Sequence, residues 1–386
     1  MKTERRRVKT EKTIIRIAGL FLALMTISTM LTACQEDAPS DGSQHELVLM
    51  PYAQPYQEAA ASLSRATEWM PTGYAAYTIP QGSSLISFIA PQTGTTVAAR
   101  IFSAGQEEGA LWKTNITVDN TSDPYYLYGF MPIGSETSTD IAISQLDGAD
   151  SYQTGAKLTI SKMKALTTQD PCVIVGAKEG TLEGVADFQL GQFAYQFSSE
   201  IGQDYVYLLF DHLFGALEFQ MQVDATYNEL RRIRLKSMQL TALTAKTVKV
   251  EVNLRATNDG TSPLSGVSPV TFTVTDGAQS DAVTLYRTAS SAEDLLLTTD
   301  YRTVGTCYIP TNVKRFKLTA EYDVYDRSGT HLVRRGCRAE NVFDLGVTDA
   351  NMQPGVKHKV KMAVNPTYLY VLSDPDLDNP TITIEH

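Results

Sequence analysis

Cysteine, histidine and tryptophan, which build many metal sites and catalytic centres, are scarce in this sequence. The 386 residues include four cysteines, five histidines and two tryptophans. Cys172, Cys307 and Cys337 stand far apart, and this spacing lacks the closely spaced ligand pairs of zinc modules. Two alternatives are open for Cys307 and Cys337: a disulfide across neighbouring strands, or two small buried hydrophobic residues.

Signatures of known catalytic sites are also missing. The sequence contains no glycine-rich phosphate loop, no G-x-S-x-G turn and no H-E-x-x-H motif. The histidines are scattered, with His45 and His386 toward the two ends and His358 at an alternate position of an expected strand. We therefore expect no enzymatic activity and no cofactor.

One acidic pattern near the C-terminus resembles a calcium-binding loop. Four carboxylates occupy positions 1, 3, 5 and 12 of an EF-hand-like spacing, namely Asp374, Asp376, Asp378 and Glu385. Asn379 stands where that loop needs glycine, and residues 381–385 have the composition of a strand. The pattern is either a weak calcium site or an Asp/Pro turn that joins two strands.

No apolar run reaches the about 20 residues that a permanent membrane helix needs. The run at residues 17–27 is short and follows a basic segment. Residues 1–33 hold seven basic and two acidic side chains, a net charge of +5. A basic segment followed by a short apolar run is typical of a secretory signal peptide.

The signal peptide ends in 31-LTAC-34, the pattern of a bacterial lipobox. We expect the Cys34 thiol to receive a diacylglycerol before the peptidase cuts in front of it, which anchors the chain in the outer membrane. The alternative is an ordinary secretory signal with a chance cysteine. The acidic residues in 35-QED-37 resemble a surface-export signal, and a polar tether would explain them equally well.

The chain after the leader is acidic. It holds 26 basic and 41 acidic residues, a net charge of −15. Because such a body repels phosphate, we expect no nucleic-acid partner.

The body has the pattern of an all-β protein. Short runs rich in Val, Ile, Thr, Tyr and Phe recur between turn residues, as in 85-LISFIA-90 and 205-YVYLLF-210. In 246-KTVKVEV-252 apolar and polar residues alternate, which predicts a half-buried antiparallel strand. The best short helix candidate is 290-SSAEDLLL-297. The spacing of strands and turns favours β-sandwiches over βαβ units.

A polar, glycine-bearing stretch at residues 198–204 suggests a domain boundary. We expect five parts in chain order: a signal peptide (1–33), a propeptide with a removable first strand (34–65), an N-terminal β-sandwich (66–200), a C-terminal β-sandwich (201–366) and a tail (367–386).

Several of these segments together resemble the fimbrillins, the subunits of type V pili of Bacteroidia. They are the lipobox, 111-LWKTNITV-118 followed by 125-YYLYGFMP-132, 205-YVYLLFDHLFGALEFQMQV-223 and the closing block at 340–366. The resemblance covers most of the chain after Cys34 and implies two tandem transthyretin-like β-sandwich domains. It also implies a cell-surface location and assembly with other fimbrillin subunits.

The resemblance further implies a role for Arg65. In fimbrillins a trypsin-like, arginine-specific protease cuts in a loop behind the first strand, here expected near 45-HELVLM-50. A cut between Arg65 and Ala66 would release the lipid and that strand, and would leave an open sheet edge for a strand of another subunit. The alternative is that Arg65 is a solvated residue of a lipid tether.

The expected donor strand lies in the tail and comprises Tyr368, Leu369, Tyr370, Val371 and Leu372. The alternative is that the tail folds onto its own domain as a last strand. The tail is shorter than the C-terminal appendage typical of stalk fimbrillins. The sequence therefore predicts a structural subunit of a fimbria that supports adhesion, or else an uncut, lipid-retained anchor or glycan-binding adhesin.

Overall fold

The computed structural model describes most of the chain between residues 44 and 385. The described ranges are 44–53, 55–58, 75–76, 84–91, 98–103, 112–119, 121–149, 155–180, 196–199, 205–254, 270–288, 294–346, 352–366 and 375–385. The chain divides into Met1–Gln44 and a compact unit, His45–His386, which contains the strands discussed below. Among the described residues, no helix has the length and apolar character needed to cross a membrane.

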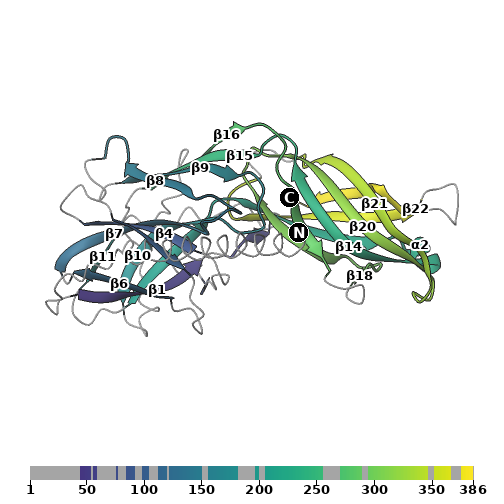
Figure 1. Ribbon diagram of the computed structural model, residues 1–386, viewed down its shortest axis with the longest axis horizontal. Coiled ribbons are helices and arrows are strands. Elements are labelled where there is room, and N and C mark those ends of the chain that lie inside the picture. The colour runs from purple at the N-terminus through teal and green to yellow at the C-terminus, as the bar shows by residue number, and fades with distance from the viewer. Residues whose placement is uncertain are drawn as a thin grey trace, which may run out of the picture. The chain divides into compact units, whose positions relative to one another are not determined.

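Four sheets make up the described fold, which confirms the predicted all-β class (Figure 1). The largest, here the nine-stranded sheet, has the order β3-β1-β12-β10-β7-β4-β5, with β11 on β7 and β6 on β1. Its strands are β1 (Gln44–Ala53), β3 (Ala75–Ala76), β4 (Ser84–Pro91), β5 (Ala98–Ser103), β6 (Trp112–Asp119), β7 (Thr121–Met131), β10 (Cys172–Gly180), β11 (Gln196–Ser199) and β12 (Tyr205–His212).

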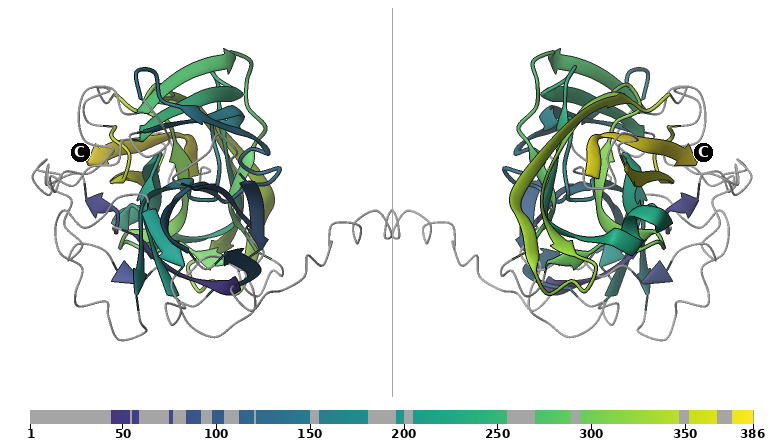
Figure 2. Two further views of the ribbon diagram at one scale, coloured as in Figure 1. Left: turned by 90° about the vertical axis from the view of Figure 1, so that its left-hand side faces the viewer. Right: turned by 90° about the vertical axis from the view of Figure 1, so that its right-hand side faces the viewer.

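Two further sheets have five strands each. The β13–β22 sheet contains β2 (Gln57–Glu58), β13 (Gly215–Val223), β19 (Arg302–Ile309), β22 (Val356–Pro366) and β23 (Pro375–Glu385). The β14–β20 sheet contains β14 (Arg231–Ala242), β17 (Val283–Arg287), β18 (Leu295–Leu296), β20 (Arg315–Asp326) and β21 (Leu332–Asp344). The end-on views show how the long paired strands β20 and β21 curve together (Figure 2).

The fourth sheet joins strands from the two halves of the sequence. This β9–β15 sheet contains β8 (Asp140–Gln145), β9 (Ala156–Lys164), β15 (Thr247–Leu254) and β16 (Val270–Asp276). Its β9–β15 ladder, like the β10–β12 ladder of the nine-stranded sheet, crosses the expected boundary at residue 200. The two-domain division by residue number therefore stays a prediction.

Strand β15 shows how the sequence pattern becomes structure. Val248, Val250 and Val252 are fully buried, while Thr247, Lys249 and Glu251 on the other face are half-buried. This confirms the predicted alternation, in which one face of the strand packs on the core. Burial of three valines at about 1.5–3 kcal/mol each fixes the register, because a shift by one residue would turn them out to solvent.

The short helix lies elsewhere than predicted. Leu295 and Leu296 of the candidate segment form strand β18, because they pair with Leu235 and Arg234 of β14. Residues 290–293 lie outside the described part of the chain. A six-residue helix, α2 (Ala225–Leu230), is found instead, capped by Asp224, whose Oδ1 accepts a hydrogen bond from the Tyr227 amide at 3.1 Å.

We expect Asp224→Ala to lower the free energy of unfolding by about 1 kcal/mol, because the first turn of α2 loses its cap. Thermal denaturation of the purified protein measures this. Asp224→Asn, which keeps an acceptor oxygen, serves as the matched control and should retain most of the stability. An equal loss in both variants would contradict the capping role.

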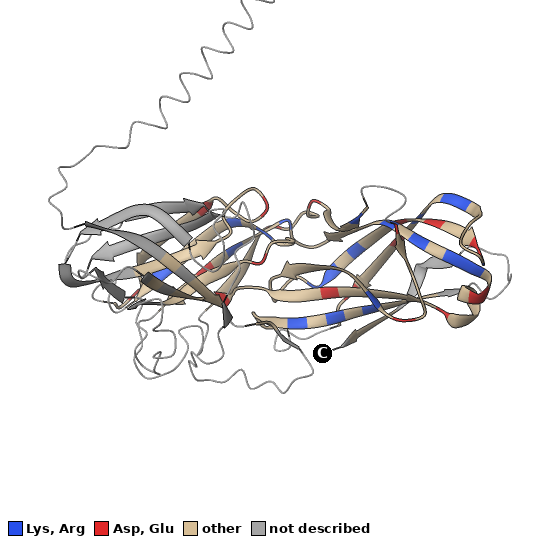
Figure 3. Ribbon diagram, turned by 90° about the horizontal axis from the view of Figure 1, so that it is seen from below, with Lys and Arg blue, Asp and Glu red and all other residues tan. Residues whose placement is uncertain are grey.

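All three described cysteines, Cys172, Cys307 and Cys337, are buried and none of them forms a disulfide. The reading of Cys307 and Cys337 as small buried hydrophobic residues is therefore confirmed, and they form no disulfide. Burial raises the pKa of the Cys307 thiol far above its ordinary value. Basic and acidic residues are interspersed along the described strands (Figure 3).

Candidate functional site

The first strand, β1, lies inside the nine-stranded sheet and not at the end of it. On one side it pairs in parallel with β12 over six residue pairs, from Val48↔Tyr205 to Ala53↔Phe210. On the other side it pairs antiparallel with β3 through Tyr52↔Ala76 and Ala53↔Ala75. The predicted first strand near residues 45–50 thus exists and contributes backbone hydrogen bonds on both sides.

The ladder between β1 and β12 is parallel, which sets it apart from other ladders of this sheet. The ladders β10–β12, β10–β7, β11–β7, β4–β5 and β4–β7 are all antiparallel. Parallel neighbours need a long crossover and cannot be joined by a tight hairpin. No short turn therefore ties β1 to β12, and the strand is held by its ladder and its side chains.

Alternate side chains of β1 face the core. Leu49 is fully buried, and Pro51 and Ala53 are buried too, whereas Tyr52 between them is half-buried. This period of two is the mark of a strand that fills one position of a packed sheet. Removing β1 would expose these apolar contacts together with the backbone edge of β12.

Tyr56 anchors the chain three residues after β1. Its hydroxyl donates a hydrogen bond to Asp170 Oδ1 at 2.7 Å, and its ring stacks on His212 at a centroid distance of 3.9 Å and an angle of 26°. The ring of Tyr308 lies 5.7 Å away. Burial, then the Asp170 charge, raises the pKa of Tyr56 well above its ordinary value, so the hydroxyl keeps its proton.

The same N-terminal segment also reaches the β13–β22 sheet. Strand β2 pairs in parallel with β22 through Gln57↔Val356 and Glu58↔Lys357. Strand β23 pairs with the next part of β22, beginning at Lys359↔Glu385. The last described residues of the chain therefore occupy the edge of β22 beside β2.

Asp170, Cys172 and His212 form a cluster next to Tyr56. Cys172 and His212 are directly opposite in the β10–β12 ladder, and Asp170 precedes Cys172 by two residues. His212 Nδ1 lies 2.8 Å from Asp170 Oδ2 and 3.4 Å from Cys172 Sγ. Cys172 is fully buried and His212 is 3% exposed. One ligand atom from each of the three residues lies within 4.8 Å of the others.

This cluster does not have the geometry of a cysteine–histidine–aspartate triad. A triad needs the nucleophile at one imidazole nitrogen and the carboxylate at the other. Here Cys172 Sγ and Asp170 Oδ2 both approach Nδ1 of His212. A proton relay through the ring is therefore not built into this arrangement.

Sequence reasoning missed this cluster, because His212 and Cys172 are 40 residues apart and were not expected to meet. The available signal was the D-x-C spacing at the start of an expected strand, since residues two apart on a strand share a face. The partner on the facing strand depends on register, which the sequence does not specify.

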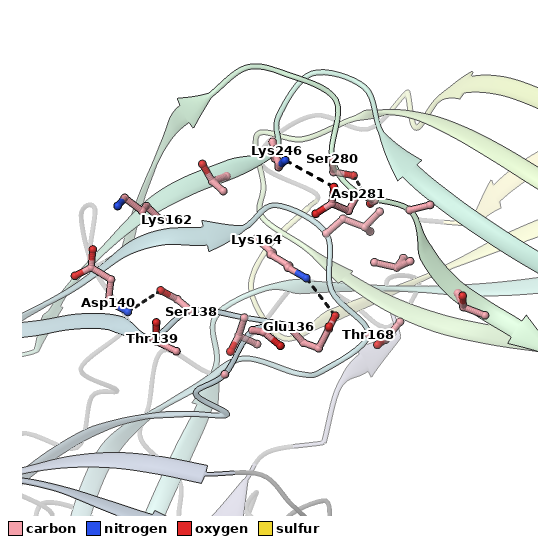
Figure 4. Close-up of a pocket in the computed structure, with 18 residues that line it drawn as sticks. Glu136, Ser138, Thr139, Asp140, Lys162, Lys164, Thr168, Lys246, Ser280 and Asp281 are labelled. Carbon is pink, nitrogen blue, oxygen red and sulfur yellow. Dashed lines mark hydrogen bonds and ion pairs between the residues drawn. The ribbon is translucent and has the colours of Figure 1, made fainter. Parts of the chain in front are cut away.

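A separate polar hollow of about 880 Å³ lies between the loops of β8 and β9 and residues near β15 and β17 (Figure 4). Two ion pairs line it: Lys164 Nζ lies 3.4 Å from Glu136 Oε2, and Lys246 Nζ lies 3.7 Å from Asp281 Oδ1. Lys162, also at its wall, has a φ of 51°, in the left-handed region.

Most residues of the predicted sites lie outside the described part of the chain. These are Cys34, Arg65, Ala66, Asp374 and the donor segment Tyr368, Leu369, Tyr370, Val371 and Leu372. The backbones of Asp376, Asp378 and Glu385 belong to β23. The β22–β23 ladder is interrupted between Ala363↔Thr381 and Asn365↔Asp376, so Asp378 lies in the irregular part of this strand.

The fold is similar to several solved structures at low sequence identity. A candidate cell adhesion protein of Bacteroides fragilis is 8% identical, with a TM-score of 0.40 over 88% of this chain and 97% of its own. A fimbrial protein of Bacteroides vulgatus is 12% identical, with a TM-score of 0.36 over 89% and 99%. The fimbrial anchor protein of Porphyromonas gingivalis is 9% identical, with a TM-score of 0.27 over 89% and 96%.

No protein-family profile matches the sequence, and neither does any curated protein. The similarity to the solved structures, at these identities and TM-scores, carries no functional argument.

Proposed function

We propose that the protein is a structural subunit of a cell-surface fimbria. In this proposal the chain is exported as a lipoprotein through Cys34, cut after Arg65 by an arginine-specific protease, and assembled with other subunits by strand exchange. The observation that carries the proposal is the position of β1. This strand precedes Arg65, yet it occupies an interior place in the nine-stranded sheet.

Loss of β1 would create a receptor for another strand. The edge of β12 from Tyr205 to Phe210 would lose six paired residues, and the sites of Leu49, Pro51 and Ala53 would be empty. Unpaired backbone groups beside apolar pockets are the features that strand addition uses. Backbone hydrogen bonds would hold the incoming strand, and the alternate pockets would set its register.

The tail supplies the proposed donor. Residues 367–386 follow β22. If the segment is a strand, one face would carry Tyr368, Tyr370 and Leu372 and the other face Leu369 and Val371. Part of the tail is already committed within the chain, because β23 pairs with β22. Donation would therefore use the segment before β23 or would require β23 to leave β22.

A second function is favoured by that pairing of β23. A chain whose tail stays on its own sheet, and whose Arg65 is not cut, would be a lipid-retained anchor or adhesin. The polar hollow near β8 and β9, at about 880 Å³, lies within the size range of small-molecule sites and is lined by hydroxyl and charged side chains. A sugar is the polar ligand class that suits it, and a glycan array tests this directly.

Arg65→Ala separates the two functions. We expect wild-type surface material to begin at Ala66 and to polymerise, whereas the variant keeps the lipid on Cys34, retains β1 and forms no polymer. N-terminal sequencing, lipid labelling and electron microscopy of surface fractions measure these three properties.

Arg327→Ala is the matched control, because Arg327 is an exposed arginine in the turn between β20 and β21. Its processing and assembly should equal those of wild type. A wild-type protein that stays acylated and monomeric, or an Arg65→Ala protein that still polymerises, would exclude the fimbrial proposal.

A further inference from the structure

We propose that Asp170, Cys172 and His212 bind one zinc-like divalent metal ion. The three side chains stand behind Tyr56 at one end of the β10–β12 ladder, outside any role assigned to them in strand exchange.

The ligand atoms already surround one small volume. Cys172 Sγ and His212 Nδ1 are 3.4 Å apart, close to the roughly 3.3–3.7 Å that separates ligands bound to zinc at about 2.0–2.3 Å in a tetrahedron. His212 Nδ1 and Asp170 Oδ2 are 2.8 Å apart, so a metal would widen this pair by about half an ångström from hydrogen-bonding to ligand distance.

The backbone holds two of the ligands in fixed relation. Cys172 and His212 are directly opposite in an antiparallel ladder that continues as far as Gly180↔Tyr205. Opposed residues of such a ladder point to the same face with Cβ atoms about 4.5–5.5 Å apart. The ladder therefore fixes the backbone positions of Cys172 and His212 relative to each other, and Asp170 precedes Cys172 by two residues.

The chemistry of the donors selects the metal class. One thiolate, one imidazole and one carboxylate form a set that suits Zn²⁺ and Co²⁺, whereas Ca²⁺ and Mg²⁺ prefer oxygen ligands alone. Three protein ligands leave the fourth tetrahedral position for water or an external group. On binding, the metal replaces the proton of the Cys172 thiol, and the remaining His212 proton resides on Nε2.

The groups that contact Asp170 and His212 resemble those that orient the ligands in protein metal sites. The Tyr56 hydroxyl holds the second carboxylate oxygen of Asp170 at 2.7 Å, and the Tyr56 ring covers the His212 ring. Such outer partners orient the ligands, and their loss typically lowers metal affinity by about 10–100-fold. We expect a loss of this size for Tyr56→Phe, which removes the hydroxyl and keeps the ring.

Tyr56 would also make metal affinity depend on the cut after Arg65, and this point rests on the proposed function. A cut after Arg65 that releases the N-terminal segment would remove Tyr56 and leave all three ligands in place. The cut protein should then bind the metal about 10–100-fold more weakly than the uncut protein, as Tyr56→Phe does. If no cut occurs, the comparison of wild type with Tyr56→Phe still tests the site.

The test is titration of the metal-free, uncut full chain with Co²⁺ and then Zn²⁺. We expect one Co²⁺ per chain with a sulfur-to-cobalt charge-transfer band, which Zn²⁺ displaces. Cys172→Ser should abolish the band, whereas Cys307→Ser should keep it, because Cys307 is an equally buried cysteine outside the cluster. Far-ultraviolet circular dichroism verifies that each variant is folded.

Zinc-edge X-ray absorption of the wild-type chain tests the site without any variant and should show one sulfur ligand. The proposal is overturned by a folded wild-type chain that gives no charge-transfer band, by a zinc shell of oxygen and nitrogen alone, or by a band that survives in Cys172→Ser.

Discussion

Leu49→Asp is expected to lower the free energy of unfolding of the uncut chain by about 3–5 kcal/mol. Leu49 is fully buried in β1, where it pairs with Val206 of β12. An aspartate at that position would bury a charge without a partner, and an uncompensated buried charge costs about this much. Urea denaturation in an Arg65→Ala background, where β1 is retained, measures the effect.

Val274→Asp is the matched control, because Val274 is 40% exposed on strand β16. That substitution should change stability by no more than about 0.5 kcal/mol. The proposed function adds a second readout: Leu49→Asp would reduce the yield of precursor, but cut subunits lack residue 49 and should polymerise normally. Equal stability of Leu49→Asp and Val274→Asp would show that β1 is not held in the sheet.

Gly305→Ala is expected to destabilise the chain by about 3 kcal/mol or more, whether or not the N-terminal segment is present. A Cβ atom at Gly305 would lie 2.3 Å from the backbone oxygen and 2.9 Å from the carbonyl carbon of Leu285. Gly305 belongs to β19 and Leu285 to β17, so two strands of different sheets approach each other here. Overpacking commonly costs 1–3 kcal/mol, and the contact with rigid backbone puts this case at the upper end.

Gly277→Ala provides the comparison, since the nearest atom to a Cβ there is 4.0 Å away. We expect it to be neutral or slightly stabilising, because alanine restricts the unfolded chain. Thermal denaturation of both variants measures the two changes in stability. A Gly305→Ala protein as stable as Gly277→Ala would mean that β17 and β19 can separate at little cost.

The strands could be predicted because their pattern is local. The alternation in β15 and the apolar runs of β4 and β12 indicate strands by themselves, and the alternation also indicates which face of β15 is buried. Helix α2 could not be found in the same way, because six residues hold less than two helical turns and depend on the cap at Asp224. The prediction of a helix at Leu295 is wrong, because the pairing of Leu295 with Leu235 is a tertiary contact that the local pattern does not show.

The candidate site was less predictable than the fold. That β1 would pair with β12, in parallel, depends on contacts between residues about 157 apart, for which no local pattern exists. The meeting of Asp170, Cys172 and His212 depends on the register of β10 against β12. The contacts of Tyr56 could not be predicted either, because a tyrosine in a proline-bearing segment is compatible both with an exposed tether and with a buried contact.

The parallel ladder of β13 and β22 has a mechanical consequence. Eight residue pairs, from Ala216↔Lys357 to Val223↔Val364, join these strands side by side in the same direction. Tension applied to the start of β13 and the end of β22 would act along the strands and load these hydrogen bonds together in shear. Peeling would break them one at a time, whereas shear requires many to fail at once. Under tension, the lifetime of the β13–β22 sheet is set by its unfolding rate. The parallel direction of β22 relative to β13 lowers that rate.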